Sequence, residues 1–143
     1  MKKMMMSLLL ALMLTLVPSC LFAANFLEIH RDDETTLFLD TASIEDNGTY
    51  YKAWIKTTYN TRDAMKKEGE RFEIDKEFNC KLDLWACEKN NKRIGPLATY
   101  FYDNDGNIIK TFNFENYPIS WISVIPGSIG EIMINKIYLF AGK

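Results

Sequence analysis

Apolar and polar residues alternate with a period of two along most of the chain after residue 25, which is the pattern of half-buried β-strands. Residues 49–59 show it best, because aromatic and β-branched residues dominate there and no Gly or Pro interrupts. Turn signals at residues 46–48 and 103–106, which end in Asn-Gly and Asp-Gly, favour tight hairpins. The other predicted strands cover residues 26–30, 35–40, 71–88 (as one strand or two), 93–103 and 107–114.

From Ser128 onward the apolar period changes to three and four residues, which indicates an amphipathic helix. Glu131 stands three residues after Ser128, so the two form a capping-box pattern at the helix start. The predicted apolar stripe consists of Ile129, Ile132, Met133, Ile137 and Phe140. Residues 62–68 would suit a short helix or an open loop. The sequence therefore predicts an α+β fold, in which an antiparallel sheet of about six strands carries a C-terminal helix on one face.

Residues 1–24 have the order of a secretory signal peptide. A lysine pair follows the first methionine, an apolar stretch spans residues 8–17, and small residues end the segment at Ala23 and Ala24. The apolar stretch is well short of the ~20 residues that cross a bilayer, and charges interrupt every later one. We expect cleavage after Ala23 or Ala24, which leaves residues 25–143 as a single exported domain with no transmembrane helix.

Cys20 leaves a second interpretation of this segment open. Residues 17–20, Val-Pro-Ser-Cys, loosely resemble the lipobox at which bacterial lipoproteins are cut and acylated. Pro18 fits poorly beside such a cut, whereas a proline several residues before the cleavage site is ordinary for the signal of a soluble protein. We therefore predict a periplasmic, secreted or cell-surface protein, with a lipid anchor at Cys20 as the alternative.

Charge and cysteine content limit the partners and the chemistry. The whole chain has a formal net charge of −2. Residues 1–24 contain two lysines and no acidic residue, so their removal makes the net charge more negative. The sequence therefore implies no basic stripe for nucleic acid. Cys80 and Cys87 are the only cysteines outside the signal, and export would allow them to form a disulfide. Seven residues of extended strand span about 23 Å, so a bridge would require a turn or a bulge between them.

No pattern of a catalytic or metal site stands out. The single histidine, His30, adjoins an acidic turn, which is a common surface arrangement. The turn at residues 103–106 departs from a calcium loop, because its glycine is fourth rather than sixth and Phe114 occupies the twelfth position. No serine has a Gly-x-Ser-x-Gly setting, and the cysteines lack redox spacing. We expect no enzyme activity, no cofactor and no metal, and a small periplasmic enzyme is the least favoured alternative.

Aromatic residues are the remaining candidates for a binding site. The chain holds three tryptophans and seven tyrosines, which could form a face for a glycan or a protein. The same residues would also suit the core of a small domain. The candidate binding face consists of Trp54, Trp85 and Trp121.

Three segments of the chain resemble the bacterial surface-adhesin protein E family. The first combines residues 39–44, Leu-Asp-Thr-Ala-Ser-Ile, with residues 52–59, Lys-Ala-Trp-Ile-Lys-Thr-Thr-Tyr. The second places Cys87 fifteen residues before Tyr102. The third and most specific is residues 121–131, Trp-Ile-Ser-Val-Ile-Pro-Gly-Ser-Ile-Gly-Glu. The likeness extends over about residues 26 to 138.

This resemblance implies an antiparallel sheet of roughly six strands, a docked C-terminal helix and exposure on the cell envelope. The best understood members are lipid-anchored adhesins that bind plasminogen and host matrix proteins such as laminin and vitronectin. Members usually tie the final helix by a second cysteine to the residue that matches Cys87. Residues 136–140 contain no cysteine here, so either packing alone holds the helix or Cys80 is the partner.

The sequence thus predicts an exported, adhesin-like binding protein. Its expected partner is a host matrix protein or another envelope protein, and a homodimer is a further option. A periplasmic structural or assembly factor without a host ligand is the alternative that the sequence leaves open.

Overall fold

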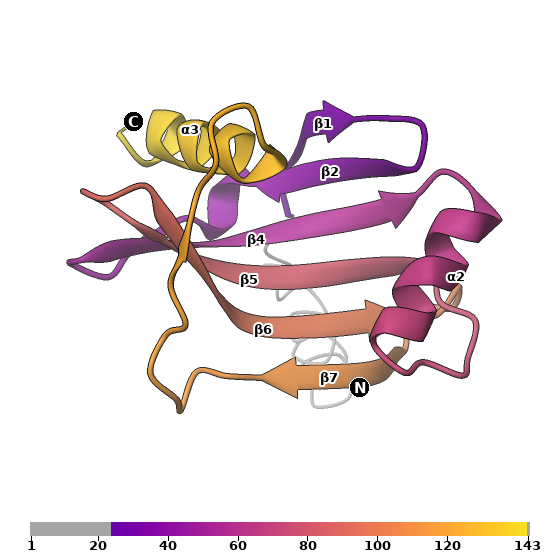
Figure 1. Cartoon of the computed structure of the whole chain (residues 1–143). Helices are drawn as coiled ribbons and strands as arrows, with labels where there is room; N and C mark the ends of the chain where they lie inside the picture. Colours follow the sequence, from indigo (N-terminus) through magenta and orange to yellow (C-terminus); the bar gives the residue numbers. More distant parts are fainter. Residues whose placement is uncertain (1–23, 143) are drawn as a thin grey trace, which may run out of the picture.

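The computed structural model describes residues 24–142, and an antiparallel sheet forms their frame (Figure 1). The strands along the sheet are β1 (Phe26–Arg31), β2 (Thr35–Asp40), β4 (Tyr50–Tyr59), β5 (Cys80–Glu88), β6 (Arg93–Tyr102) and β7 (Ile108–Asn113). Two short strands, β3 (Glu45–Asp46) and β8 (Ile122–Ser123), pair with β4 and β6. The helices are η1 (Thr41–Ser43), α2 (Arg62–Arg71) and α3 (Ile129–Ala141). The predicted sheet with a C-terminal helix is confirmed.

The predicted strand over residues 71–88 is wrong in its first part. Helix α2 continues through Arg71, the backbone at Glu73 has a φ of 52°, and β5 begins only after this turn. The two phenylalanines of this part, Phe72 and Phe78, pack their rings against other aromatic side chains. The Phe72 ring lies 5.1 Å from Phe101 and 5.5 Å from Phe112, measured between centroids. The conformation of this segment depends on contacts with rings from distant strands, which the alternation of apolar and polar residues cannot reveal.

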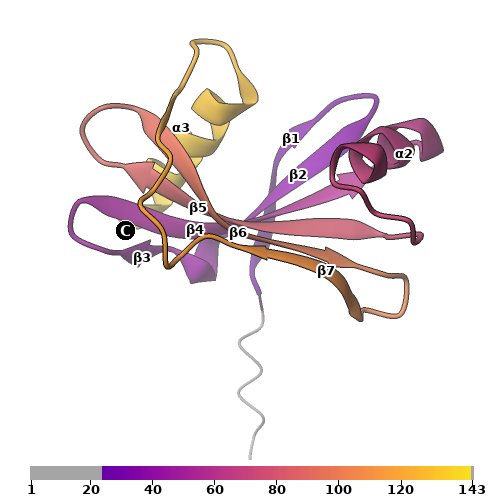
Figure 2. The same ribbon diagram turned by 60° about the horizontal axis from the view of Figure 1, so that its bottom comes forward.

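Pairing along the whole length of β4 and β5 divides their side chains between two faces of the sheet. Opposite residues such as Ala53 and Trp85, or Trp54 and Leu84, project to the same face, and successive residues project to opposite faces. Figure 2 shows α2 and α3 on one side of the sheet. We call that side the helix face and the other side the open face.

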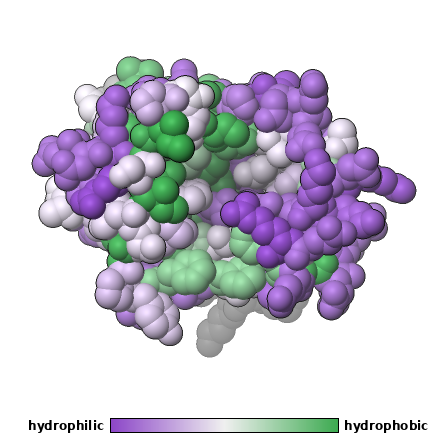
Figure 3. Space-filling view, in the orientation of Figure 1, coloured by the Kyte–Doolittle hydropathy of each residue, from purple (hydrophilic) through white to green (hydrophobic). Residues whose placement is uncertain are grey.

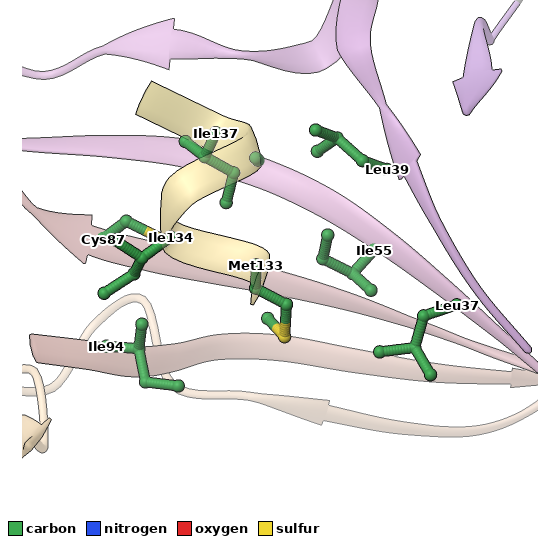
Figure 4. Close-up of a cluster of buried hydrophobic side chains, with 9 residues drawn as sticks. Leu37, Leu39, Ile55, Cys87, Ile94, Met133, Ile134 and Ile137 are labelled. Carbon is green, nitrogen blue, oxygen red and sulfur yellow. The ribbon is translucent and has the colours of Figure 1, made fainter. Parts of the chain in front are cut away.

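The main core lies between α3 and the helix face (Figure 4). It consists of Leu37, Leu39, Ala53, Ile55, Cys87, Ile94, Met133, Ile134 and Ile137. Ile134 was not in the predicted stripe yet is fully buried, whereas Ile129 is 39% exposed and Ile132 is half-buried. The first turn of the helix lies close to the sheet at Gly130, where an added Cβ would lie 3.4 Å from Ile94 Cδ1.

The start of α3 is confirmed at Ser128. The Ser128 hydroxyl accepts a hydrogen bond from the Glu131 amide at 3.4 Å, as an N-cap should. The Glu131 carboxylate accepts from the Gly127 amide at 2.8 Å instead of from the cap residue itself. The motif therefore fixes where the helix begins, although its reciprocal bond is displaced by one residue.

We expect Ile134→Asp to lower the free energy of unfolding by at least about 3 kcal/mol, because it removes a fully buried side chain and buries an unpaired carboxylate. The exposed neighbour offers a matched control: Asn135→Asp should cost less than about 1 kcal/mol. Urea unfolding measures both. Small and equal losses would show that α3 is not packed on the sheet.

A polar cluster joins α2 to the centre of the helix face. The Lys81 ammonium donates to the Glu68 carboxylate and lies 3.5 Å from the Asp83 carboxylate. Asp83 also accepts a hydrogen bond of 2.6 Å from the Thr99 hydroxyl. The side chains of Lys81, Glu68 and Asp83 are only 14%, 16% and 10% exposed. Since α2 is strongly polar in sequence, these shielded ion pairs and the Phe72 ring hold it on the sheet.

The Asp83 carboxyl should make stability depend on pH. Burial raises its pKa, against the opposing effect of the Lys81 ammonium. A folded pKa above the unfolded value of about 4 means that Asp83 stabilises the fold at low pH and that this contribution is lost as pH rises through the folded pKa. Asp83→Asn keeps the acceptor for Thr99, so it should remove part of the loss that wild type shows as pH rises above about 4.

Urea unfolding at a series of pH values tests this expectation. The exposed turn variant Asp105→Asn is the control and should follow the wild type. A difference between Asp83→Asn and wild type that stays constant with pH would contradict the expectation.

Candidate functional site

The structure corrects the predicted binding face, because the three tryptophans do not share one surface. Trp85 pairs with Ala53 and packs against the main core on the helix face. Trp54 pairs with Leu84 and projects to the open face, where Trp121 also packs. The predicted face therefore combined Trp54 and Trp121, which share the open face, with Trp85, which lies on the other face.

Four aromatic side chains gather on the open face. The rings of Tyr50 and Trp121 lie 5.9 Å apart, edge to face, and those of Trp54 and Tyr100 lie 5.7 Å apart, tilted by 56°. All four are half-buried. They surround a second, smaller core of Leu84, Ala86, Leu97 and Ala98. We call Tyr50, Trp54, Tyr100 and Trp121 the aromatic surface. The two tyrosines were not among the predicted site residues, although Tyr50 lies four residues before Trp54 and therefore on the same face of β4.

Gly95 lets the chain after β7 cross the open face. A Cβ at this position would meet Ile119 and would lie 3.2 Å from the backbone oxygen of Ser120. Backbone cannot yield as a flexible side chain can, so only glycine fits here, as is common where another segment approaches a strand closely. This contact brings Trp121 beside Tyr50.

Cationic groups lie around the aromatic surface. The Arg93 guanidinium lies 5.7 Å from the Trp121 ring centroid and donates to Glu88 at 2.7 Å. Hydrogen bonding to Arg93 holds the pKa of Glu88 below its ordinary value, so this pair stays charged at neutral pH. Lys52, beside Trp54 on the strand, pairs with Glu45 at 3.0 Å. Aromatic rings next to arginine are the composition that protein interfaces favour.

The disulfide between Cys80 and Cys87 that the sequence left open is not formed, and both thiols are free. The two cysteines are separated by an odd number of steps within the continuous strand β5, so they project to opposite faces. Burial raises the pKa of Cys87 to about 12 and also raises that of Cys80. Neither thiol therefore has the lowered pKa of a reactive cysteine. Cys20 lies outside the described residues.

Helix α3 is held without a disulfide. Its buried isoleucines pack on the sheet, and the Tyr138 hydroxyl donates a hydrogen bond to the backbone oxygen of Glu88. Glu88 directly follows Cys87, so the hydrogen bond joins the helix to β5 beside that cysteine.

The acidic turns are structural where the structure describes them. The Asp103 carboxylate accepts from the backbone amides of Asp105 and Asn107 at 2.9 and 2.8 Å, which fits a hairpin turn. His30 Nε2 lies 3.4 Å from Asp32. Within residues 24–142, no group of three or more His, Cys, Asp or Glu residues is placed to hold a metal ion.

Two further surfaces were not predicted. A cavity of about 450 Å³ lies between α2 and the turn that follows it, with Met65, Gly69, Ile74 and Phe78 among its lining residues. Ile122, Ile125 and Ile129 are 53%, 71% and 39% exposed where the chain enters α3. Figure 3 shows apolar atoms gathered in that region. Of the helices in the described part of the chain, none is long and apolar enough to span a membrane.

Comparison with known proteins places this architecture in a family. The family model of surface-adhesin protein E matches residues 26–137. No curated protein and no solved structure matches the chain. The matched range begins with β1 and ends within α3, so it contains the sheet, the aromatic surface and the buried part of the helix. Because the match covers most of the chain, the protein belongs to the surface-adhesin protein E family.

Proposed function

We propose that this protein is an exported binding protein of the cell envelope that holds a macromolecular partner on the aromatic surface of its open face. The observation that carries this proposal is the placement of the rings. The helices cover the opposite face, while Tyr50, Trp54, Tyr100 and Trp121 are left half-exposed together. Membership of a surface-adhesin family supports an adhesin-like role.

The chemistry of this surface suits binding rather than catalysis. Partly exposed tryptophan and tyrosine supply large contact areas at a small cost in side-chain entropy, and such residues are frequent energetic anchors of interfaces. Arg93 and Lys52 add charged donors at the rim. The described residues bring no nucleophile, base and oxyanion donor together at this surface, so we propose no reaction.

Export is part of the proposal. The order of charged, apolar and small residues in positions 1–24 supports a cleaved signal peptide. Residues 25–143 would then be the mature domain, and acylation at Cys20 would be the alternative route to the envelope. The free state of Cys80 and Cys87 does not argue against export, because their positions in β5 prevent pairing in any compartment.

The family resemblance makes a host matrix protein, such as laminin or vitronectin, the first partner to test. We expect Trp54→Ala to weaken binding of the purified protein to immobilised laminin or vitronectin by about tenfold or more, because it removes a central ring. Leu139→Ala is the control, since Leu139 is 55% exposed on α3 and lies away from the open face. Surface plasmon resonance compares the dissociation constants.

Equal affinities for wild type, Trp54→Ala and Leu139→Ala would contradict a binding role for the aromatic surface. Protease added to intact cells gives a second readout. If the protein is fully protected until the envelope is opened, it is a periplasmic structural or assembly factor rather than an adhesin.

A further inference from the structure

The sheet ends in an open edge at β7. This strand is the last in the order of the sheet and pairs with β6, as the lower edge of Figure 1 shows. The Phe114 amide donates to the Leu97 oxygen at 2.8 Å, and Phe112 stands opposite Thr99. In an antiparallel ladder, every second residue directs its N–H and C=O away from the partner strand. In β7 that residue is Thr111, together with Asn113 two positions later.

The opposite edge of the sheet, β1, is protected against further pairing. It contains an irregularity between Glu28 and His30, and an ion pair of 2.8 Å joins Arg31 to Glu28. Bulges and charged side chains are the usual means by which edge strands avoid additional strands. The two edges of this sheet therefore differ in their capacity to accept a partner.

β7 has less of this protection. Its irregularity lies at the hairpin end, before Lys110, so the register from Lys110 to Asn113 is regular. Apolar residues at its two ends are exposed, 53% for Ile108 and 41% for Phe114. An edge of this kind presents unpaired backbone groups beside apolar surface, and an added β-strand satisfies both.

The positive charge of Lys110 favours an incoming strand that carries acidic residues. Lys110 stands opposite Phe101 and projects to the same face as Phe112, whose ring centroid is 5.6 Å from its ammonium group. Lys110 is in none of the ion pairs formed among residues 24–142. Arg71 lies over the neighbouring Phe72 ring, but its charge is paired with Glu68 at 3.8 Å. An incoming strand would therefore meet the positive charge of Lys110 on the helix-face side of the edge.

We propose that β7 binds an extended, acidic segment of a partner polypeptide as an additional strand of the sheet. The backbone of that segment bonds to Thr111 and Asn113, and one of its carboxylates lies beside Lys110. The inference rests on the proposed function as a binding protein and specifies how the partner is held. It uses a different part of the sheet from the aromatic surface, so the two are separable by mutation.

The experiment uses arrays of peptides of about twelve residues that cover laminin and vitronectin, probed with the folded protein. Thr111→Pro removes an outward N–H and keeps the ladder to β6, because proline is tolerated on the free side of an edge strand. Thr111→Val is its matched control. We expect the peptides that bind wild type to be acidic, to bind Thr111→Pro at least about tenfold more weakly, and to bind Thr111→Val unchanged.

A charge variant and an exchange measurement keep the proposal falsifiable if Thr111→Pro folds poorly. Lys110→Glu changes a half-buried side chain and leaves the backbone donors of β7 in place, so it should weaken binding of the acidic peptides by a similar factor. Hydrogen exchange at the Thr111 and Asn113 amides should slow when a peptide binds. Absence of acidic peptides among the binders, or unchanged exchange at both amides, would overturn the proposal.

Whole-protein binding separates this proposal from the proposed function. Laminin or vitronectin binding that is lost in Trp54→Ala but kept in Thr111→Pro and Lys110→Glu would support the aromatic surface and overturn the strand proposal. A wild-type dimer in sedimentation that Thr111→Pro converts to a monomer would also overturn it, since the edge would then be occupied by a second copy of the protein.

Discussion

The uninterrupted ladder between β4 and β5 is the constraint on which the rest of the structure depends. It extends from the pair Tyr50 and Glu88 to the pair Thr58 and Cys80 without a bulge. A shift by one residue would exchange the two faces of a strand, because side chains alternate with a period of two. The ladder therefore decides that Ile55 enters the core under α3 and that its neighbours project to the open face.

This division accounts for the different ways in which the two faces are used. Aliphatic residues and Cys87 give the helix face an apolar surface on which α3 packs. At the other end of this face, the ion pairs of Lys81 hold the polar helix α2 on the sheet. The open face receives no helix. The segment around Ile119 covers the rings of this face only in part. This segment approaches the sheet closely at Gly95, where no side chain is in the way. The open face, with its partly exposed rings, is therefore the face to which we assign the proposed binding function.

Local patterns in the sequence predicted the sheet and the start of α3, because alternation and capping act over a few residues. The pairing between strands is not local, so nothing in the sequence showed that Trp54 and Trp85 lie on opposite faces. The first part of the predicted strand, residues 71–79, was misassigned for the same reason, since the Phe72 ring packs against β6 and β7 there. For Cys80 and Cys87 the sequence left one strand or two open, and the continuous strand β5 decides that they project to opposite faces.

Thiol labelling of the folded protein tests this division of faces most directly. Cys80 is half-buried on the open face, whereas Cys87 is 0% exposed beneath α3. With a small alkylating reagent under native conditions and mass spectrometry of the digested protein, we predict that Cys80 is modified much faster than Cys87 and that no bond joins them. Equal rates for the two thiols, or a Cys80–Cys87 disulfide in the native protein, would contradict the register of β5 and with it the assignment of the two faces.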